Sequence, residues 1–312
     1  SNYQKTLINL GAAGIQTVCY NFMPVVDWTR TNLEYLLPDN SQALRFDIVD
    51  FAVYDIFVLQ RSGASNSYDK SVVEGARERF GGLDQRAVAA LENNIIAGLP
   101  GGEGSYDRAG ILAAIEHFNQ FDNEAYRQNL IAFLRDIMPA AEVADINMVI
   151  HPDDPPFSLF GLPRVLSTAE DVRKLVAAVP SASNGLTLCA GSFGARGDNN
   201  LVAMAEEFGD RIHFVHLRNI KRESDGSFYE SAHLEGDNDI VGLVAALLAV
   251  EAADSSGQRA IAMRPDHGHT LTSEQADPRL KPGYSYGGRM KGLAELRGVI
   301  HALTALGTGG RP

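Results

Sequence analysis

Five short apolar runs, separated by helical patterns, constrain the fold of this chain more than any other feature. Each run is too short for a helix, ends in polar or turn residues, and lacks a clean alternation of apolar and polar positions. Such runs are typical of parallel strands that are buried on both faces of a sheet. The predicted strands are residues 17–22, 147–150, 186–189, 212–217 and 260–263.

Helical patterns lie between these strands, so strand and helix alternate along the chain. A first helix is predicted at residues 3–10, and Pro139 is expected to end the helix that begins at Tyr126, because proline lacks a backbone N–H. The alternation predicts βαβ units and a parallel sheet in an α/β fold. The later predicted helices are residues 126–138, 169–179, 199–208, 240–252 and 289–305.

The stretch from about residue 23 to residue 122 does not follow this alternation. It contains helical patterns at residues 47–59 and 87–96 and a glycine-rich break at residues 98–102. We predict a helical insertion that covers one face of a single domain spanning residues 1–312. An eight-stranded barrel needs three strands more than the five found. The pattern by itself therefore leaves open an incomplete barrel or an open sheet.

Composition narrows the function classes. The net charge of −12 argues against nucleic acid or an anionic membrane surface as a partner. No apolar run reaches the roughly 20 residues of a membrane span, and the polar N-terminus shows no signal peptide. Two cysteines, Cys19 and Cys189, are too few for a disulfide framework, which favours a cytoplasmic protein.

Metal-ligating residue types follow four successive predicted strands. His151 and Cys189 stand at the ends of two of these strands, His216 near the end of the next, and Asp266 three residues after the last. Because the carboxyl ends of parallel strands meet at one edge, these side chains are expected to gather there. Thiolate and imidazole favour zinc, whereas a site completed by hydroxy-acid oxygens also suits manganese or ferrous iron.

Each of these residues also has a purely structural interpretation. Cys189 fits a small buried apolar residue, and His216 fits a histidine of the core. Asp266 fits a turn after Pro265, and His151 fits an ordinary loop position. The recurrence at equivalent strand ends favours the metal site.

Proton-transfer and anion-binding residues lie close to this set. His267 adjoins Asp266 and is able to move a proton at neutral pH, and Tyr284 follows on the next loop, where a cation would lower its pKa. The candidate carboxylate-binding residues, which fit surface or capping roles equally well, are Arg218, Arg264 and Arg289.

Two further segments carry weaker signals. Asp153 and Asp154 lie in a proline-stiffened loop and fit either ligand-holding residues or solvated turn residues, the latter being favoured for Asp154. The glycines of residues 191–194 form a weak phosphate-loop signal, and no GxGxxG or Walker-type motif supports nucleotide binding.

Five segments form a specific set, namely YNFMPV (20–25), DWTRT (27–31), HPDDPP (151–156), RPDHGH (264–269) and GRMKGL (288–293). Together they resemble the signature segments of bacterial mannonate dehydratases, over essentially the whole chain. The resemblance implies a xylose-isomerase-like (β/α)8 barrel, in which the five predicted strands are the fourth to the eighth and the first three are absent from this chain. It also implies an enzyme that uses Mn²⁺ or Fe²⁺ rather than Zn²⁺.

The resemblance assigns roles to residues already singled out. The implied metal ligands are His151, Cys189, His216 and Asp266, and the implied proton-transfer pair is His267 and Tyr284. Substrate contacts are predicted at Asn21, Arg218, Arg264 and Arg289. The expected partner is a small sugar acid, and the expected assembly is a homo-oligomer, a dimer or a tetramer.

The implied reaction is dehydration of D-mannonate to 2-keto-3-deoxy-D-gluconate in hexuronate (glucuronate) breakdown. We expect a metal-assisted β-elimination in which Tyr284 takes the C2 proton and His267 protonates the departing C3 hydroxyl. Two alternatives remain at this stage. One is a metal-dependent sugar isomerase or epimerase on the same barrel, and the other is a truncated paralogue that binds metal or sugar acid without turnover.

Overall fold

The computed structural model describes residues 1–26, 28–96, 107–256 and 259–307. Within them, five strands form a parallel sheet in the order β1-β4-β5-β6-β9. The strands are β1 (Thr17–Tyr20), β4 (Asn147–Ile150), β5 (Asn184–Cys189), β6 (Ile212–His216) and β9 (Ala262–Arg264). All five predicted strands are therefore confirmed, in parallel pairing throughout.

The parallel sheet is rolled rather than flat. In a flat sheet β1 and β6, which have two strands between them, would lie about 14 Å apart at a spacing of roughly 4.8 Å per strand. Instead these two strands contact each other. Within the described residues β1 and β9 are the edge strands and do not pair, so the sheet is a parallel half-barrel.

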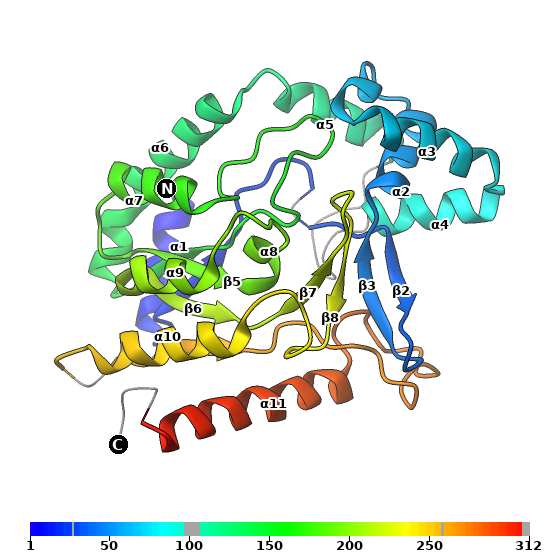
Figure 1. The fold of residues 1–312 in the computed structure, drawn as a ribbon. Helices are drawn as coiled ribbons and strands as arrows, with labels where there is room; N and C mark the ends of the chain where they lie inside the picture. The colour runs from blue at the N-terminus through cyan, green and yellow to red at the C-terminus, as the bar shows by residue number, and fades with distance from the viewer. Residues whose placement is uncertain (27, 97–106, 257–258, 308–312) are drawn as a thin grey trace.

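Helices pack around the half-barrel, on the left of Figure 1. They are α1 (Asn2–Ala12), α6 (Asn123–Val143), α7 (Ala169–Ala178), α8 (Ala190–Gly194), α9 (Leu201–Glu207), the 3₁₀ turn η3 (Gly209–Arg211), α10 (Ile240–Ala252) and α11 (Tyr286–Ala305). Side chains such as Leu130 of α6, Leu188 of β5 and Leu247 of α10 are fully buried in one apolar core. The alternation of strand and helix seen in the sequence is thus the α/β architecture itself.

The expected stop at Pro139 is wrong, because α6 runs through this proline to Val143. Pro139 cannot donate to the carbonyl four residues earlier. The helix nevertheless continues, since Ile137, Met138 and Ala141 on both sides of the proline are buried in the core. Tertiary burial here outweighs a local helix breaker.

A second sheet was not predicted. It is antiparallel, in the order β2-β3-β8-β7, and stands beside the half-barrel in Figure 1. Its strands are β2 (Asn32–Leu36), β3 (Gln42–Phe46), β7 (Asn219–Arg222) and β8 (Phe228–Ser231). Two of them come from the stretch 23–122 and two from the segment after β6. Segments this short show little periodicity in the sequence, so whether they form strands depends on the segments with which they pair.

The stretch 23–122 therefore contains strands as well as helices. Its helices are α2 (Ile48–Val53), the π-helix η1 (Tyr54–Val58), the 3₁₀ turn η2 (Ala64–Ser67), α3 (Lys70–Gly81), α4 (Gln85–Ile96) and α5 (Arg108–Phe118). Most of them contribute to a second apolar core, which includes the fully buried Phe46 and Phe228 of the antiparallel sheet. The glycine-rich break at 98–102 and Asp27 of the second signature segment lie outside the described residues.

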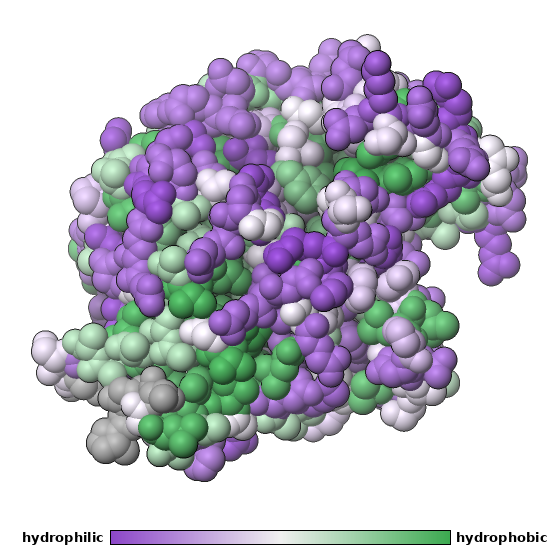
Figure 2. Space-filling model, viewed as in Figure 1, coloured by the Kyte–Doolittle hydropathy of each residue, from purple (hydrophilic) through white to green (hydrophobic). Residues whose placement is uncertain are grey.

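The outer surface is mostly polar on the face shown in Figure 2, with apolar side chains gathered over α10 and α11. Exposed apolar residues of these two helices are Val241, Tyr286 and Met290. Among the described residues no helix has the length and apolar character needed to span a membrane.

Candidate active site

The carboxyl ends of three neighbouring strands bring together the first three predicted metal ligands. His151 directly follows β4, Cys189 ends β5 and His216 ends β6. Cys189 and His216 are register partners, so their side chains stand side by side. The possible ligand atoms of the three residues all lie within 4.8 Å of one another.

The protonation of His151 leaves one nitrogen free to bind. Its Nδ1 lies 2.7 Å from the main-chain oxygen of Pro152. Because a carbonyl oxygen only accepts hydrogen bonds, Nδ1 carries a proton, and in the neutral ring the lone pair therefore resides on Nε2. A neighbouring acceptor that fixes the ring in this way is the usual arrangement for a metal-binding histidine.

The three residues fit a divalent transition metal. Both ring nitrogens of His216 are buried and have no hydrogen-bond partner among the described residues, although buried polar groups normally have one. Burial alone would raise the pKa of the Cys189 thiol, but Arg218 and His151 outweigh it and hold that pKa well below its ordinary value. A thiolate beside two imidazoles is a donor set for such a metal.

Asp266 lies next to this cluster rather than within it. Its Oδ2 is 3.6 Å from His216 Nδ1, while its Oδ1 accepts a hydrogen bond from Arg264 Nη2 at 2.7 Å. Burial opposes ionisation, but His267, His216 and the nearby arginines hold the pKa of Asp266 well below its usual range. Its backbone φ of +29° is uncommon for a residue other than glycine. The structure therefore gathers three of the four predicted ligands tightly and places the fourth carboxylate against them.

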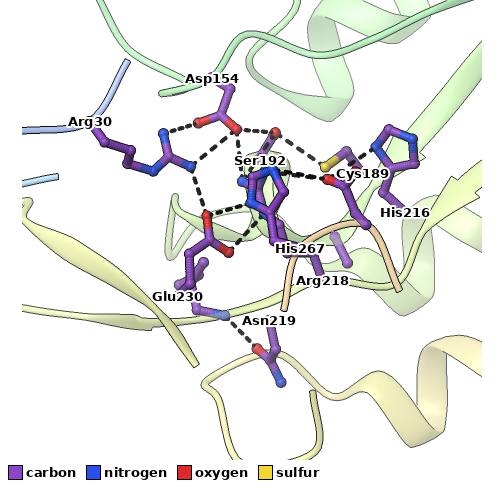
Figure 3. A network of polar contacts seen from close by, with 12 residues as sticks. Arg30, Asp154, Cys189, Ser192, His216, Arg218, Asn219, Glu230 and His267 are labelled. Atoms are coloured by element: carbon purple, nitrogen blue, oxygen red, sulfur yellow. Dashed lines mark hydrogen bonds and ion pairs between the residues drawn. The ribbon is translucent and has the colours of Figure 1, made fainter. Parts of the chain in front are cut away.

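A buried ionic network lies beside the cluster (Figure 3). Asp154 accepts hydrogen bonds from Arg30 Nη1 at 2.9 Å and from Arg218 Nη2 at 2.8 Å. Glu230 of β8 lies 2.9 Å from Arg30 Nη2 and 3.2 Å from Arg218 Nε. Two guanidiniums and two carboxylates thus alternate in a closed ring, and Ser192 Oγ also donates to Asp154 at 3.0 Å.

The predicted solvent exposure of Asp154 is wrong, since this residue is 1% exposed. Burial raises the pKa of its carboxyl, but Arg218 and Arg30 outweigh that effect and hold it well below its usual range. For Glu230 the same balance, with Arg218 and His267 as the main opposing groups, lowers the pKa to about 2. Both carboxylates are therefore ionised inside the protein.

Arg30, Glu230 and Ser192 are site residues that the sequence reasoning missed. Arg30 belongs to the signature segment DWTRT (27–31), and this membership was the signal that could have identified it as a site residue. Glu230 lies on a strand of the antiparallel sheet, whose existence was not predicted. Without that strand, no pattern connected residue 230 with the strand ends of the half-barrel.

The predicted proton-transfer pair, His267 and Tyr284, is in contact. The ring centroids are 5.2 Å apart, and the Trp28 ring also stands edge-on to His267, with a centroid distance of 6.0 Å. His267 Nδ1 lies 3.1 Å from Glu230 Oε1. Burial, followed by the Asp266 charge, raises the pKa of Tyr284 to about 12. The lowered pKa expected for this phenol thus does not come from the protein groups around it.

The predicted substrate-binding residues take different positions. Asn21, Arg218 and Arg264 line the cavity, while Arg289 places its guanidinium 5.7 Å from the centre of the Tyr284 ring. Arg218 is buried among carboxylates, with Asp266 Oδ2 also 3.6 Å from its Nη1. Arg264 is the more accessible, with 41% of its side chain exposed.

The cavity itself encloses about 490 Å³ of space, part of which is open to solvent. It is lined by Cys19, Asn21, Trp28, His151, Asp154, His216, Arg218, Arg264, Asp266, His267 and Tyr284. Gly191 of α8, part of the weak phosphate-loop signal, serves a different purpose here. A Cβ on this residue would overlap the Arg218 guanidinium, so glycine is needed for the close approach.

Comparisons with known proteins identify a family for the chain as a whole. The D-mannonate dehydratase (UxuA) family model matches residues 1–308. A mannonate dehydratase of Saccharophagus degradans is 63% identical over 98% of this chain and 78% of its own length. One from Agrobacterium fabrum is 52% identical over 97% of this chain and 77% of its own length. The crystal structure of mannonate dehydratase from Streptococcus suis serotype 2 superposes with a TM-score of 0.73 at 32% identity, covering 100% of this chain and 73% of that one.

Proposed function

We propose that the cavity at the strand ends is the active site of this chain. The chain belongs to the mannonate dehydratase family and dehydrates D-mannonate, which is a lyase reaction of hexuronate breakdown. One observation carries this assignment. His151, Cys189 and His216 offer ligand atoms within 4.8 Å of one another, and the cavity that contains two of them also contains His267 and Tyr284.

The proposed ligands are His151, Cys189 and His216, with Asp266 as the fourth, and the proposed metal is Mn²⁺ or Fe²⁺ rather than Zn²⁺. The donor set alone suits all three ions, but a hydroxy-acid substrate that adds oxygen ligands favours the first two. When bound, the metal supplies positive charge that polarises the substrate carboxylate and makes the neighbouring C2–H bond more acidic.

The proposed reaction is a β-elimination carried out by His267 and Tyr284. One side chain takes the C2 proton, the C2–C3 double bond forms, and the C3–O bond breaks. The other side chain donates a proton to the departing hydroxyl, so that water leaves and the enol becomes 2-keto-3-deoxy-D-gluconate. These two rings are in contact inside the cavity, and we assign Tyr284 as the base and His267 as the acid.

Substrate binding is proposed for Asn21, Arg264 and Arg289. Arg264 lies at the cavity with 41% of its side chain exposed, and its Nε has no hydrogen-bond partner among the described residues. A planar guanidinium binds a carboxylate through paired hydrogen bonds. Arg218 also faces the cavity, but its nitrogens already contact Asp154 and Glu230. We propose that Arg218 contributes positive charge to the substrate site rather than a free donor.

We also propose that the half-barrel is part of an eight-stranded xylose-isomerase-like barrel in which the stretch 23–122 is an insertion within a single domain. The rolled sheet, in which β1 contacts β6, supports this architecture. A cytoplasmic location is proposed because both cysteines are free thiols. The proposed assembly is a dimer or tetramer, which light scattering on the purified chain would test.

The activity assay uses protein reconstituted with Mn²⁺, Fe²⁺ or Zn²⁺ and a panel of aldonic acids, with the 2-keto-3-deoxy acid as the product measured. D-mannonate is expected to react fastest, with Mn²⁺ or Fe²⁺. The His267→Asn variant should keep its metal and lose turnover, since the ring does not belong to the ligand cluster. A near-normal rate in that variant would remove His267 from the mechanism, and a ketose product would identify an isomerase instead.

A further inference from the structure

Glu230 reaches the proposed catalytic histidine from a different sheet. It lies on β8, while His267 follows β9, 37 residues later. We propose that Glu230 is a positioning residue that holds His267 in one tautomer and one orientation, so that Nε2 is the nitrogen that exchanges the substrate proton. This inference deepens the proposed function and rests on the role given there to His267.

The contacts of Glu230 make its carboxylate a pure acceptor. Its Oε1 lies 2.9 Å from Arg30 Nη2 and its Oε2 lies 3.2 Å from Arg218 Nε. Its side chain is 4% exposed. A carboxylate between two guanidiniums stays ionised and has no proton to give. The hydrogen on the 3.1 Å contact with His267 therefore belongs to Nδ1 of the ring.

The other nitrogen of His267, Nε2, is then free to exchange a proton with the substrate. With the proton on Nδ1, the neutral ring has its lone pair on Nε2, which lies 3.7 Å from Asp266 Oδ2. Trp28 and Tyr284 stand at 86° and 74° to the plane of His267 and limit its rotation. A carboxylate behind the histidine of a catalytic triad fixes the tautomer and orientation of the ring in the same way.

A neighbouring histidine provides the opposite tautomer for comparison. His269 Nε2 lies 3.0 Å from the main-chain oxygen of Glu230, so its proton belongs on Nε2. The two rings are two residues apart in sequence and bind two different oxygens of the same residue. They therefore serve as mutual references when the tautomers are measured.

The first experiment reads the tautomer directly, independently of turnover. Protein labelled with ¹⁵N at histidine is studied by NMR both metal-free and with diamagnetic Zn²⁺, and His267 is assigned by loss of its signals in His267→Asn. Wild-type His267 should show a protonated Nδ1, and His269 a protonated Nε2. A wild-type His267 with the proton on Nε2 would overturn the proposal, whatever the variants do.

The second experiment uses two variants with graded chemistry. Glu230→Gln keeps an acceptor oxygen but loses the charge, and Glu230→Leu loses both, while Arg30 and Arg218 still have Asp154 as a partner in each. We expect kcat to fall on the order of 10²-fold in Glu230→Leu and less in Glu230→Gln. KM and metal content should change little, and His267 should become a tautomer mixture in Glu230→Leu.

Asp55→Asn is the matched control. Asp55 is also a buried carboxylate, ion-paired with Arg61 at 2.6 Å, but it belongs to the stretch 23–122 and not to the cavity lining. It should lose thermal stability without a change in kcat or in the His267 signals. If Glu230→Leu behaves like this control, Glu230 is only structural and the proposal fails. Wild-type protein without mannonate turnover would instead refute the proposed function, leaving the tautomer result intact.

Discussion

The replacement of Asp154 by asparagine tests the buried ionic network most directly. The Asp154 carboxylate is 1% exposed and accepts hydrogen bonds from Arg30 at 2.9 and 3.3 Å, from Arg218 at 2.8 Å and from Ser192 at 3.0 Å. An asparagine amide removes the charge and one of the two acceptor oxygens. Its NH₂ group would then face a guanidinium that can only donate.

The magnitude follows from what remains. Removing one member of a buried ion pair typically costs 3–5 kcal/mol, because the partner charge stays buried. Here both guanidiniums keep Glu230 as a partner, at 2.9 and 3.2 Å. We therefore expect Asp154→Asn to lower the free energy of unfolding by about 3 kcal/mol, the low end of that range. This is a large part of the roughly 5–15 kcal/mol that stabilises a typical domain.

Equilibrium urea unfolding followed by circular dichroism measures this loss on metal-free protein, since bound metal would add its own stabilisation. Asp198→Asn is the control, because its pair with Arg196 at 2.6 Å is on the surface, with the two side chains 60% and 31% exposed. Surface pairs contribute about 1 kcal/mol or less. If Asp154→Asn costs no more than Asp198→Asn, the carboxylate is solvated and the network does not exist as described.

Three further perturbations test other parts of the molecule. Gly191→Ala should displace the Arg218 guanidinium, which the added Cβ would overlap, and lower both melting temperature and turnover; an unchanged melting temperature would contradict the close packing. Cys189→Ala should lose metal because it removes the only thiolate of the three-residue cluster, and elemental analysis that finds full metal content would exclude Cys189 as a ligand. Burial, followed by Arg259 and Arg211, lowers the pKa of His213 to about 4. Below about pH 6.5, His213 is therefore protonated in the unfolded chain but stays neutral in the folded one. The free energy of unfolding consequently falls as the pH drops. Between pH 7 and pH 5, the free energy of unfolding of His213→Gln should fall by about 1 kcal/mol less than that of wild type, after allowance for the partial exposure of the ring. Equal shifts of the urea midpoint in the two proteins would refute this.

The parts of the fold that were predictable are those with a local physical signature. A strand buried on both faces, such as β4, contains an unbroken apolar run, here Met148–Ile150, and this pattern is visible in the sequence without knowledge of the rest of the sheet. The parallel order then places His151 and Cys189 at one edge. Three proposed metal ligands could be found from the sequence because strand direction alone determines where such ends lie.

The errors have a common cause, which is that burial depends on distant residues. Nothing near Pro139 shows that the helix around it will be held by the core. Nothing in the loop sequence shows that Asp154 will meet Arg30, 124 residues earlier, and Arg218, 64 residues later. A proline and an aspartate have strong local preferences, and in both places long-range contacts contribute more free energy than those preferences do.

The amino-acid sequence by itself determined the alternating α/β plan, the edge of the sheet at which the proposed metal ligands gather, and the segments by which the family is recognised. The tertiary structure alone decided which charges are buried together, and it brought Glu230 of the antiparallel sheet to His267 beside the parallel one. The physical reason is range. Periodicity and turn chemistry act over a few residues, whereas ion pairs and desolvation act between any groups that the packing of two sheets brings within a few ångströms.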